Sequence, residues 1–326
     1  MSASLIGPTN IAELTSPRAG ERRLGDLVGR GAAAWALVGI PEDIGVRANF
    51  GRGGTAAMWP AFLRRFLAMP APESMGSGVV AVAGEVAVAN LQAESVRLNA
   101  AVPADLARLR EMTAKVDELV SDALAGVLRG PSIPVVIGGG HNNGLAVSRA
   151  LRQAHGCAHA VINCDAHADL RDMEGRHSGN PFTYAQHELA LAKYAVIGFS
   201  PLGASPAVLK RLDGRSASAW SVDDIHADRL SIAAAASQAR QFIGEGPWSL
   251  EIDLDCVAGL PCSATSASGF SGGQLRALVR AVVAGQRPPA AVHICEGIPQ
   301  PETHNDPGPR LAAELVMDII ASAGPR

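Results

Sequence analysis

The chain lacks an excess of basic residues and any long uncharged apolar stretch. Its 326 residues include 28 Lys and Arg against 31 Asp and Glu, a formal net charge of −3. This balance argues against nucleic acid as a partner, since proteins that bind it carry a basic surface. No apolar stretch reaches the roughly 20 residues that span a bilayer, and residues 1–23 lack the continuous apolar region of a secretory signal. We therefore expect a cytoplasmic protein with no membrane partner.

The sequence also lacks paired cysteines. The five are odd in number, and no two are spaced as Cys-x-x-Cys: Cys157, Cys164, Cys256, Cys262 and Cys295. Several lie within apolar stretches, as expected for buried, reduced thiols in a cytoplasmic protein. The pattern argues against a zinc site built from cysteines.

Internal repeats and long linkers are absent as well. We find no period of 20–50 residues and no Pro/Ser-rich linker, and the apolar fraction of 48% is enough for a sizeable core. We therefore expect a single domain. We assign residues 1–30 to an N-terminal extension and residues 31–326 to the domain.

Short apolar segments alternate with longer amphipathic ones. We expect strands over residues 34–40, 79–83, 133–137, 158–164, 194–199, 248–254 and 291–295. We expect helices over residues 104–128, 143–153, 206–212, 231–243, 273–284 and 309–322. Several strand segments are apolar at nearly every position, as in parallel strands that are covered on both faces. The alternation predicts a three-layer α/β fold, a mostly parallel sheet with helices on both faces.

Acidic and imidazole side chains follow four of the expected strands. In chain order they are His141, the group Asp165, His167 and Asp169, the pair Asp253 and Asp255, and Glu296. Ligands of open parallel sheets bind beyond the carboxyl ends of the strands. The four strands are therefore expected to bring these side chains to one edge of the sheet.

The segment from Asp165 to Asp169 has the pattern of a metal site. Residues at alternate positions of an extended chain point the same way, so Asp165, His167 and Asp169 can converge. The alternative is a solvated loop. Together with His141, Asp253 and Asp255 the set has two imidazoles and four carboxylates, more negative charge than one Zn²⁺ site normally holds. It suits two ions such as Mn²⁺ with bridging carboxylates, which can lower the pKa of a shared water.

Four motifs resemble those of the ureohydrolase superfamily, which includes arginases and agmatinases. They are Gly-Gly-Gly-His at 138–141, Asp-Ala-His-Ala-Asp at 165–169, Asp-Leu-Asp at 253–255 and the C-terminal Glu296, in order and at suitable spacing. Residues 45–52 and 175–182 are similar to segments of the formimidoylglutamase-like branch. The resemblance implies an arginase-like fold. It also implies a homo-oligomer, because family members are commonly trimers or hexamers.

The resemblance further implies a binuclear centre with two Mn²⁺ per chain, Ni²⁺ being an alternative metal. His141, Asp165, Asp169 and Asp253 would hold one ion, and His167, Asp165, Asp253 and Asp255 would hold the other. Asp165 and Asp253 would then bridge the two ions. Asp169 would also orient the attacking hydroxide, which makes it a catalytic candidate.

Two residues bear on the substrate. By resemblance, Glu296 would accept charge-assisted hydrogen bonds from amidine or guanidinium nitrogens; otherwise it is a structural residue at a helix start. Arg171 stands where arginases have Asn. Its guanidinium would repel that of arginine but pair with the carboxylate of an acidic substrate. A surface ion pair is the alternative for Arg171.

The segment around His177 departs from the arginase pattern. Arginases place a proton-transferring His three residues before a Pro, and here Ser178 has that place, with His177 one residue earlier. His177 is a candidate proton donor to the leaving amine, or a solvated loop residue. The remaining substrate-binding candidates are Ser178, Asn180, Arg47 and Asn49.

We expect a hydrolase of a linear amidine, with N-formimidoyl-L-glutamate and water giving L-glutamate and formamide, a step of histidine degradation. The alternatives are a ureohydrolase that releases urea from arginine, agmatine or a guanidino acid, and a non-catalytic metal-binding protein. Residues 256–262 replace the Asp-Pro and Pro/Gly-rich loop of many ureohydrolases, which leaves the substrate open.

Other acidic and imidazole residues are harder to place. Glu251 lies two residues before Asp253, and it either orients a metal ligand or faces solvent. The other histidines have no ligand-like grouping in the sequence, and we expect them to be structural or exposed: His155, His159, His187, His226, His293 and His304.

Overall fold

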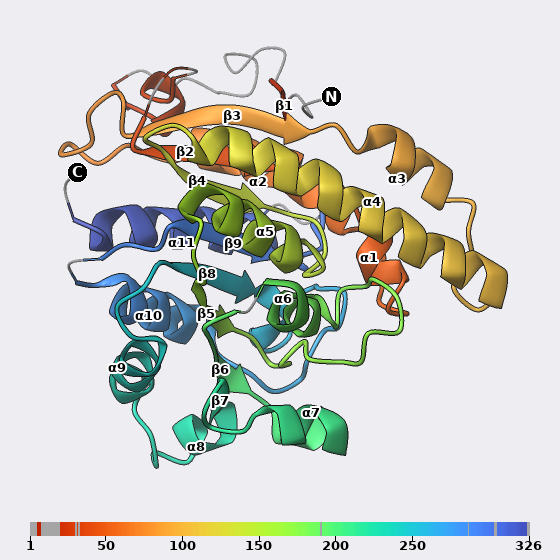
Figure 1. Cartoon of the computed structure of the whole chain (residues 1–326). Helices are drawn as coiled ribbons and strands as arrows, with labels where there is room; N and C mark the ends of the chain where they lie inside the picture. The colour runs from red at the N-terminus through yellow and green to blue at the C-terminus, as the bar shows by residue number, and fades with distance from the viewer. Residues whose placement is uncertain are drawn as a thin grey trace.

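Nine strands of the described residues form one sheet (Figure 1). The structure is a computed structural model that describes residues 5–7, 20–29, 31, 33–189, 191–285, 287–302 and 305–324. In spatial order the strands are β1 (Leu5–Ile6), β3 (Val80–Val86), β2 (Trp35–Gly39), β4 (Ile133–Ile137), β9 (Ala291–Cys295), β8 (Trp248–Asp253), β5 (Ala160–Cys164), β6 (Lys193–Phe199) and β7 (Ala217–Ser221). Only the β1–β3 pairing is antiparallel. The sheet therefore is mostly parallel, as the sequence predicts.

Helices cover both faces of this sheet. On one face α2 (Met58–Leu67), α11 (Pro307–Ser322), α10 (Gly272–Val283) and α9 (Ile232–Ile243) pack against one another in that order. On the other face lie α4 (Pro103–Leu128), α5 (Asn143–His155) and α6 (Pro181–Leu189), with the short α1 (Ile44–Arg47) against α4. The shorter helices are α3 (Ala89–Ser95), α7 (Pro206–Arg211) and α8 (Val222–His226).

Alternation along the strands separates the two apolar cores. In β4, Ile133, Val135 and Ile137 join the core under α2 and α9–α11, whereas Val136 joins the core under α4 and α5. Successive side chains of a strand point to opposite faces, so a strand covered on both sides is apolar throughout. The three-layer α/β fold predicted from the sequence is confirmed.

The seven expected strands and six expected helices are all present. Within the extension assigned to residues 1–30, Leu5–Ile6 pairs with β3, and Gly29 bridges to Ala81. Residues 1–4, 8–19 and 30 lie outside the described residues, so the domain boundary stays a prediction. No helix of the described part of the chain is both long and apolar enough to cross a membrane.

Candidate metal centre and active site

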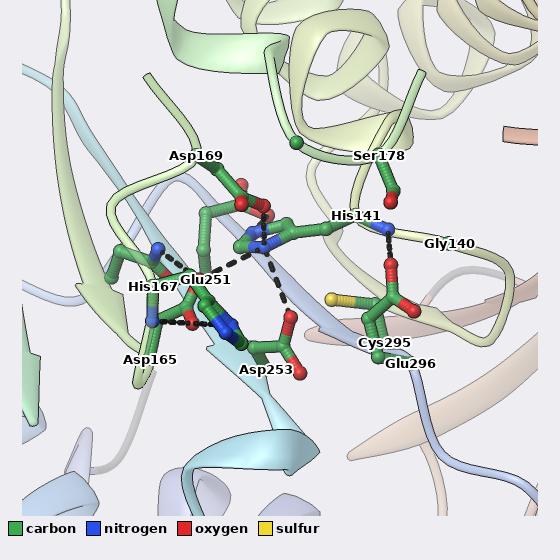
Figure 2. A network of polar contacts seen from close by, with 12 residues as sticks. Gly140, His141, Asp165, His167, Asp169, Ser178, Glu251, Asp253, Cys295 and Glu296 are labelled. Atoms are coloured by element: carbon green, nitrogen blue, oxygen red, sulfur yellow. Dashed lines mark hydrogen bonds and ion pairs between the residues drawn. The ribbon is translucent and has the colours of Figure 1, made fainter. Parts of the chain in front are cut away.

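The four strands expected to carry the polar side chains are neighbours in the middle of the sheet. Their order is β4, β9, β8, β5, and their carboxyl ends lie at one edge because all three pairings are parallel. His141, Glu296, Asp253 and Asp165 follow or end these strands. Figure 2 shows them converging, together with His167 and Asp169. This edge is where ligands of open parallel sheets bind.

The first cluster surrounds the fully buried imidazole of His141. Its Nδ1 atom lies 2.9 Å from Asp169 Oδ2, 3.2 Å from Asp165 Oδ2 and 3.3 Å from Asp253 Oδ2. One nitrogen and three carboxylate oxygens therefore face a common point, as expected of ligands to one divalent cation.

The second cluster is centred on His167. Its Nδ1 atom lies 2.9 Å from Asp255 Oδ2 and 3.7 Å from Asp165 Oδ1. Asp165 therefore offers one oxygen to each cluster, which is the arrangement of a bridging carboxylate. The second carboxylate oxygen of Asp253, Oδ1, accepts a 2.8 Å hydrogen bond from the amide of Asp255.

Burying this group of carboxylates costs free energy unless further positive charge lies beside them. Burial raises the pKa of Asp253 well above its usual range, raises that of Asp169, and raises that of Asp255 to about 6. The carboxylate of Asp255 in turn raises the pKa of His167 to about 11. Asp255 Oδ1 and both ring nitrogens of His141 are buried without a hydrogen-bond partner. Unpaired atoms of this kind fit metal cations, which would neutralise the acids and use these atoms as ligands.

Two non-glycine residues of the site have left-handed backbone. Asp169 has φ +47° and Glu296 has φ +64°. Such conformations cost free energy in residues with a side chain, and they persist where the surroundings fix them, often at functional sites. Both residues line a cavity together with His167, Asp253 and Asp255.

Glu296 also connects two of the central strands. Its Oε1 atom accepts a 2.6 Å hydrogen bond from the amide of His141, drawn in Figure 2, while its Oε2 atom is buried without a hydrogen-bond partner. Burial raises the pKa of Glu296 to about 8. A buried acid with one free oxygen is suited to hold a cationic group.

A buried acid that the sequence did not indicate supports the Gly-Gly-Gly-His loop. Glu42 follows β2, and its Oε1 atom accepts hydrogen bonds from Gly140 N at 2.9 Å and Asn143 Nδ2 at 2.7 Å. Its Oε2 atom accepts one from Ile44 N at 2.7 Å. Glu42 thereby fixes the chain next to His141. Its only signal in the sequence is a carboxylate directly after an apolar strand.

One cavity of about 560 Å³ opens over both clusters. Its lining includes four of the predicted catalytic or substrate-binding residues outside the metal-ligand set: Arg171, Ser178, Asn49 and Glu296. Arg171 Nη1 lies 3.4 Å from Asn49 Oδ1, and Asn49 donates to Ser178 Oγ at 3.2 Å. Among the described residues no carboxylate forms an ion pair with Arg171, so its guanidinium is free for a ligand in the cavity.

Arg47, His177 and Asn180 are placed elsewhere, and none of them lines this cavity. Arg47 donates to the carbonyls of Ser95 and Leu98. His177 is fully buried; its Nδ1 accepts from Gly179 N, and burial lowers its pKa to about 3.

Asn180 is likewise committed to the protein, since its amide donates to the carbonyls of Asp172 and Gly175 and its oxygen faces Arg176. For these three residues the geometry favours structural roles. The solvated-loop alternative for His177 is wrong, because the ring has no exposed surface.

Glu251 and His293 are buried close to the first cluster. Glu251 is fully buried, so the solvent-facing alternative is wrong. His293 was expected to lack any ligand-like grouping, yet its buried ring lies with His141 and Cys295 and contacts Glu251 at 2.7 Å. The pairing crosses two strands that are more than 40 residues apart in the chain, so no local pattern indicates it. His304 lies outside the described residues.

The arginase family model matches residues 33–321, so the chain belongs to the arginase family. Among curated relatives, a formimidoylglutamase of Aromatoleum aromaticum is 30% identical over 269 residues, 76% of this chain and 70% of that protein. A formimidoylglutamase of Corynebacterium efficiens is 30% identical over 208 residues, which is 62% of this chain and 65%, just under two thirds, of that protein. A proclavaminate amidinohydrolase of Streptomyces clavuligerus is 28% identical over 208 residues, 60% of this chain and 64% of that protein.

Solved structures share the fold. Trypanosoma cruzi formiminoglutamase with Mn²⁺ superposes with a TM-score of 0.72 at 20% identity, covering 92% of this chain and 97% of that one. Formimidoylglutamase from Bacillus subtilis gives a TM-score of 0.74 at 16% identity, covering 94% and 93%. This chain therefore shares the fold of these structures, and its curated relatives include formimidoylglutamases and an amidinohydrolase.

Proposed function

We propose that this chain is a binuclear manganese hydrolase that converts N-formimidoyl-L-glutamate and water to L-glutamate and formamide. The observation that carries the proposal is Arg171. Its guanidinium, without an ion-pair partner among the described residues, lines the same cavity as both imidazole clusters and Glu296. A cavity lined by both a buried acid and a cation without an ion-pair partner among the described residues fits an amidine that carries a carboxylate.

The metal ions of this proposal are two Mn²⁺. One would be held by His141, Asp165, Asp169 and Asp253, and the other by His167, Asp165, Asp253 and Asp255. When bound, such ions lower the pKa of a water and polarise the amidine group. The surplus of buried carboxylates and the two-sided position of Asp165 support a pair, and the Mn²⁺ named for the T. cruzi structure supports the metal. Ni²⁺ suits a similar ligand set.

The remaining roles fall to residues at the cavity wall. The free Oε2 atom of Glu296 accepts from the amidine nitrogens and holds the planar cation in place. Asp169 accepts a proton from the attacking water. His177 does not line the cavity, and in this proposal Asp169 would also return a proton to the leaving amine. Arg171 pairs with a substrate carboxylate, with Asn49 and Ser178 beside it.

A substrate panel tests the proposal. The Mn²⁺-loaded protein is assayed for formamide and glutamate from formimidoylglutamate, and for urea from arginine, agmatine and a guanidino acid. We expect kcat/KM for formimidoylglutamate to exceed that for agmatine, which has no carboxylate, at least about tenfold, since a charged hydrogen bond contributes roughly 1.5–3 kcal/mol. Faster release of urea would contradict the substrate. No turnover with two ions bound would favour a non-catalytic protein.

A guanidino acid is the second candidate. Such a substrate also carries a carboxylate for Arg171, and a proclavaminate amidinohydrolase is among the relatives. The panel separates the two, because one releases formamide and the other urea.

We also propose that the protein is cytoplasmic and forms a homo-oligomer. All five cysteines are free and four of them are buried, which supports a reducing, cytoplasmic environment. A homo-oligomer is proposed from the family resemblance alone.

A further inference from the structure

Glu251 and His293 form a buried pair behind His141. They are register partners on β8 and β9, and Glu251 Oε2 lies 2.7 Å from His293 Nδ1. The second ring nitrogen of His293, Nε2, faces the carbonyl oxygen of Gly138 at 3.4 Å. Both side chains are fully buried, and neither lines the cavity. The pair therefore cannot contact a substrate there, and any role in the reaction must act through another residue.

The residue through which it can act is His141. The Nδ1 atom of His141 faces three carboxylates, and its Nε2 atom lies 3.8 Å from Glu251 Oε2 (Figure 2). A neutral imidazole has one N–H, and a nitrogen that binds a metal must offer its lone pair. An ion at the Nδ1 side thus requires the proton on Nε2. A buried carboxylate on that side favours this tautomer.

We propose that the Glu251–His293 pair is a positioning pair for His141. It fixes the tautomer and orientation of the imidazole, and thereby the affinity of the ion at the His141 cluster. The inference rests on the proposed two-ion centre. Glu251 lies 3.8 Å from Nε2, beyond hydrogen-bond length, so it would act through its charge. Removal of the groups that orient a metal-binding His typically changes metal affinity about 10–100-fold.

The surroundings of Glu251 are built to keep it in place. A side-chain carbon added at Gly144, in the first turn of α5, would lie 3.6 Å from Glu251 Oε2, so the carboxylate sits against that turn. The partial positive charge at a helix N-terminus is favourable beside an acid. The ring of Phe182 meets that of His141 edge to face, with centroids 5.2 Å apart. A buried Glu–His pair adds little net stability over an apolar pair, which points to a role other than stability.

Titration with Mn²⁺ tests the pair. Wild type, Glu251→Gln, Glu251→Leu and Ser249→Ala are compared by equilibrium dialysis and electron paramagnetic resonance. Ser249 is the matched control, since it is buried on the same strand and the same side, with a hydroxyl that has no hydrogen-bond partner. We expect two tight sites in wild type and Ser249→Ala. In Glu251→Leu one site weakens about 10–100-fold while the other stays within about twofold.

The conservative variant separates positioning from packing. Glu251→Gln keeps the shape and a polar oxygen near His141 Nε2 but removes the negative charge, so we expect a smaller loss of affinity than for Glu251→Leu. The resonance signal of a coupled Mn²⁺ pair should give way to that of isolated Mn²⁺ at the same metal concentration. If Glu251→Leu fails to fold by circular dichroism, Glu251→Gln and His293→Gln are compared instead, and the same single site must weaken.

The outcomes are distinguishable. Two equally tight sites in folded Glu251→Leu overturn the positioning role and leave the proposed function intact. If Glu251→Leu does not fold, the same result in both Glu251→Gln and His293→Gln overturns it. Fewer than two sites in wild type overturn the two-ion centre and, with it, the inference.

Discussion

In the proposed function, Arg171 binds the carboxylate of the substrate. Its guanidinium donates to the neutral amide of Asn49, and among the described residues no carboxylate forms an ion pair with it. We expect Arg171→Asn to raise KM for formimidoylglutamate about 10–100-fold, the equivalent of a lost charged hydrogen bond. Arg171→Lys keeps the charge without the paired geometry and should be intermediate. Steady-state kinetics measure this, with Arg229→Asn, an exposed arginine paired with Asp224, as control. An unchanged KM removes the role.

The buried imidazole of His159 should make the folded protein less stable as the pH falls. Burial lowers its pKa from 6.5 to about 4, and neither ring nitrogen has a hydrogen-bond partner. Above pH 6.5 the ring is neutral whether the chain is folded or not. As the pH falls toward 4 the unfolded chain takes up the proton first, so up to about 3 kcal/mol of stability is lost.

The variant His159→Leu should show a smaller loss of stability between pH 7 and pH 4.5. Denaturant unfolding at several pH values measures this, with the exposed His187→Gln as control. An identical pH dependence in wild type and His159→Leu would show that another group is responsible.

Asp165, His167 and Asp169 could be predicted as one group, and Asp253 and Asp255 as another, because the spacing within each segment is local. Their combination with His141 was implied by the order of the motifs. Alternate acids and imidazoles at a strand end point the same way whatever the rest of the fold does. Glu42 and His293 could not, because their partners lie about 98 and 42 residues away, and only the strand order brings them together. The surroundings of Arg47 and His177 could not be predicted for the same reason. Their carbonyl and amide partners come from segments that no motif mentions.

Among the helices and strands, the central strands of the sheet are the ones that the sequence predicts best. The strands β4, β9, β8 and β5 are apolar throughout because helices cover both of their faces. The edge strand β7, Ala-Ser-Ala-Trp-Ser, has no such pattern and was not predicted. In the unpredicted helix α2, Pro60 lies in the first turn, where its missing N–H costs no helical hydrogen bond.

The loop after β4 is held in place by hydrogen bonds to the carboxylate of Glu42. All of its contacts are N–H donors, so an amide nitrogen in place of one oxygen would face a donor. We expect Glu42→Gln to lower the free energy of unfolding by about 2–4 kcal/mol and to weaken Mn²⁺ binding. Denaturant unfolding of the metal-free protein measures the first effect. The surface pair Glu188–Arg149 supplies the control Glu188→Gln, expected to cost under about 1 kcal/mol. Equal losses in the two variants would contradict this role for Glu42.

For the whole molecule, the parallel sheet concentrates negative charge at one edge. Asp165, Asp253 and Asp255 have almost no exposed surface, and Asp169 little more. The fold holds these acids together without enough positive charge from the two imidazoles. Binding of cations to the folded chain alone would supply that charge and stabilise the fold.

The number of Mn²⁺ ions bound per chain tests this arrangement most directly. Equilibrium dialysis with metal analysis should give two ions for wild type. It should give one for Asp255→Ala, which removes a ligand from the His167 cluster only, and fewer than one for Asp165→Ala, which removes one oxygen from each cluster. A single ion in wild type, or the same count in wild type and Asp165→Ala, would contradict a two-ion centre at this edge of the sheet.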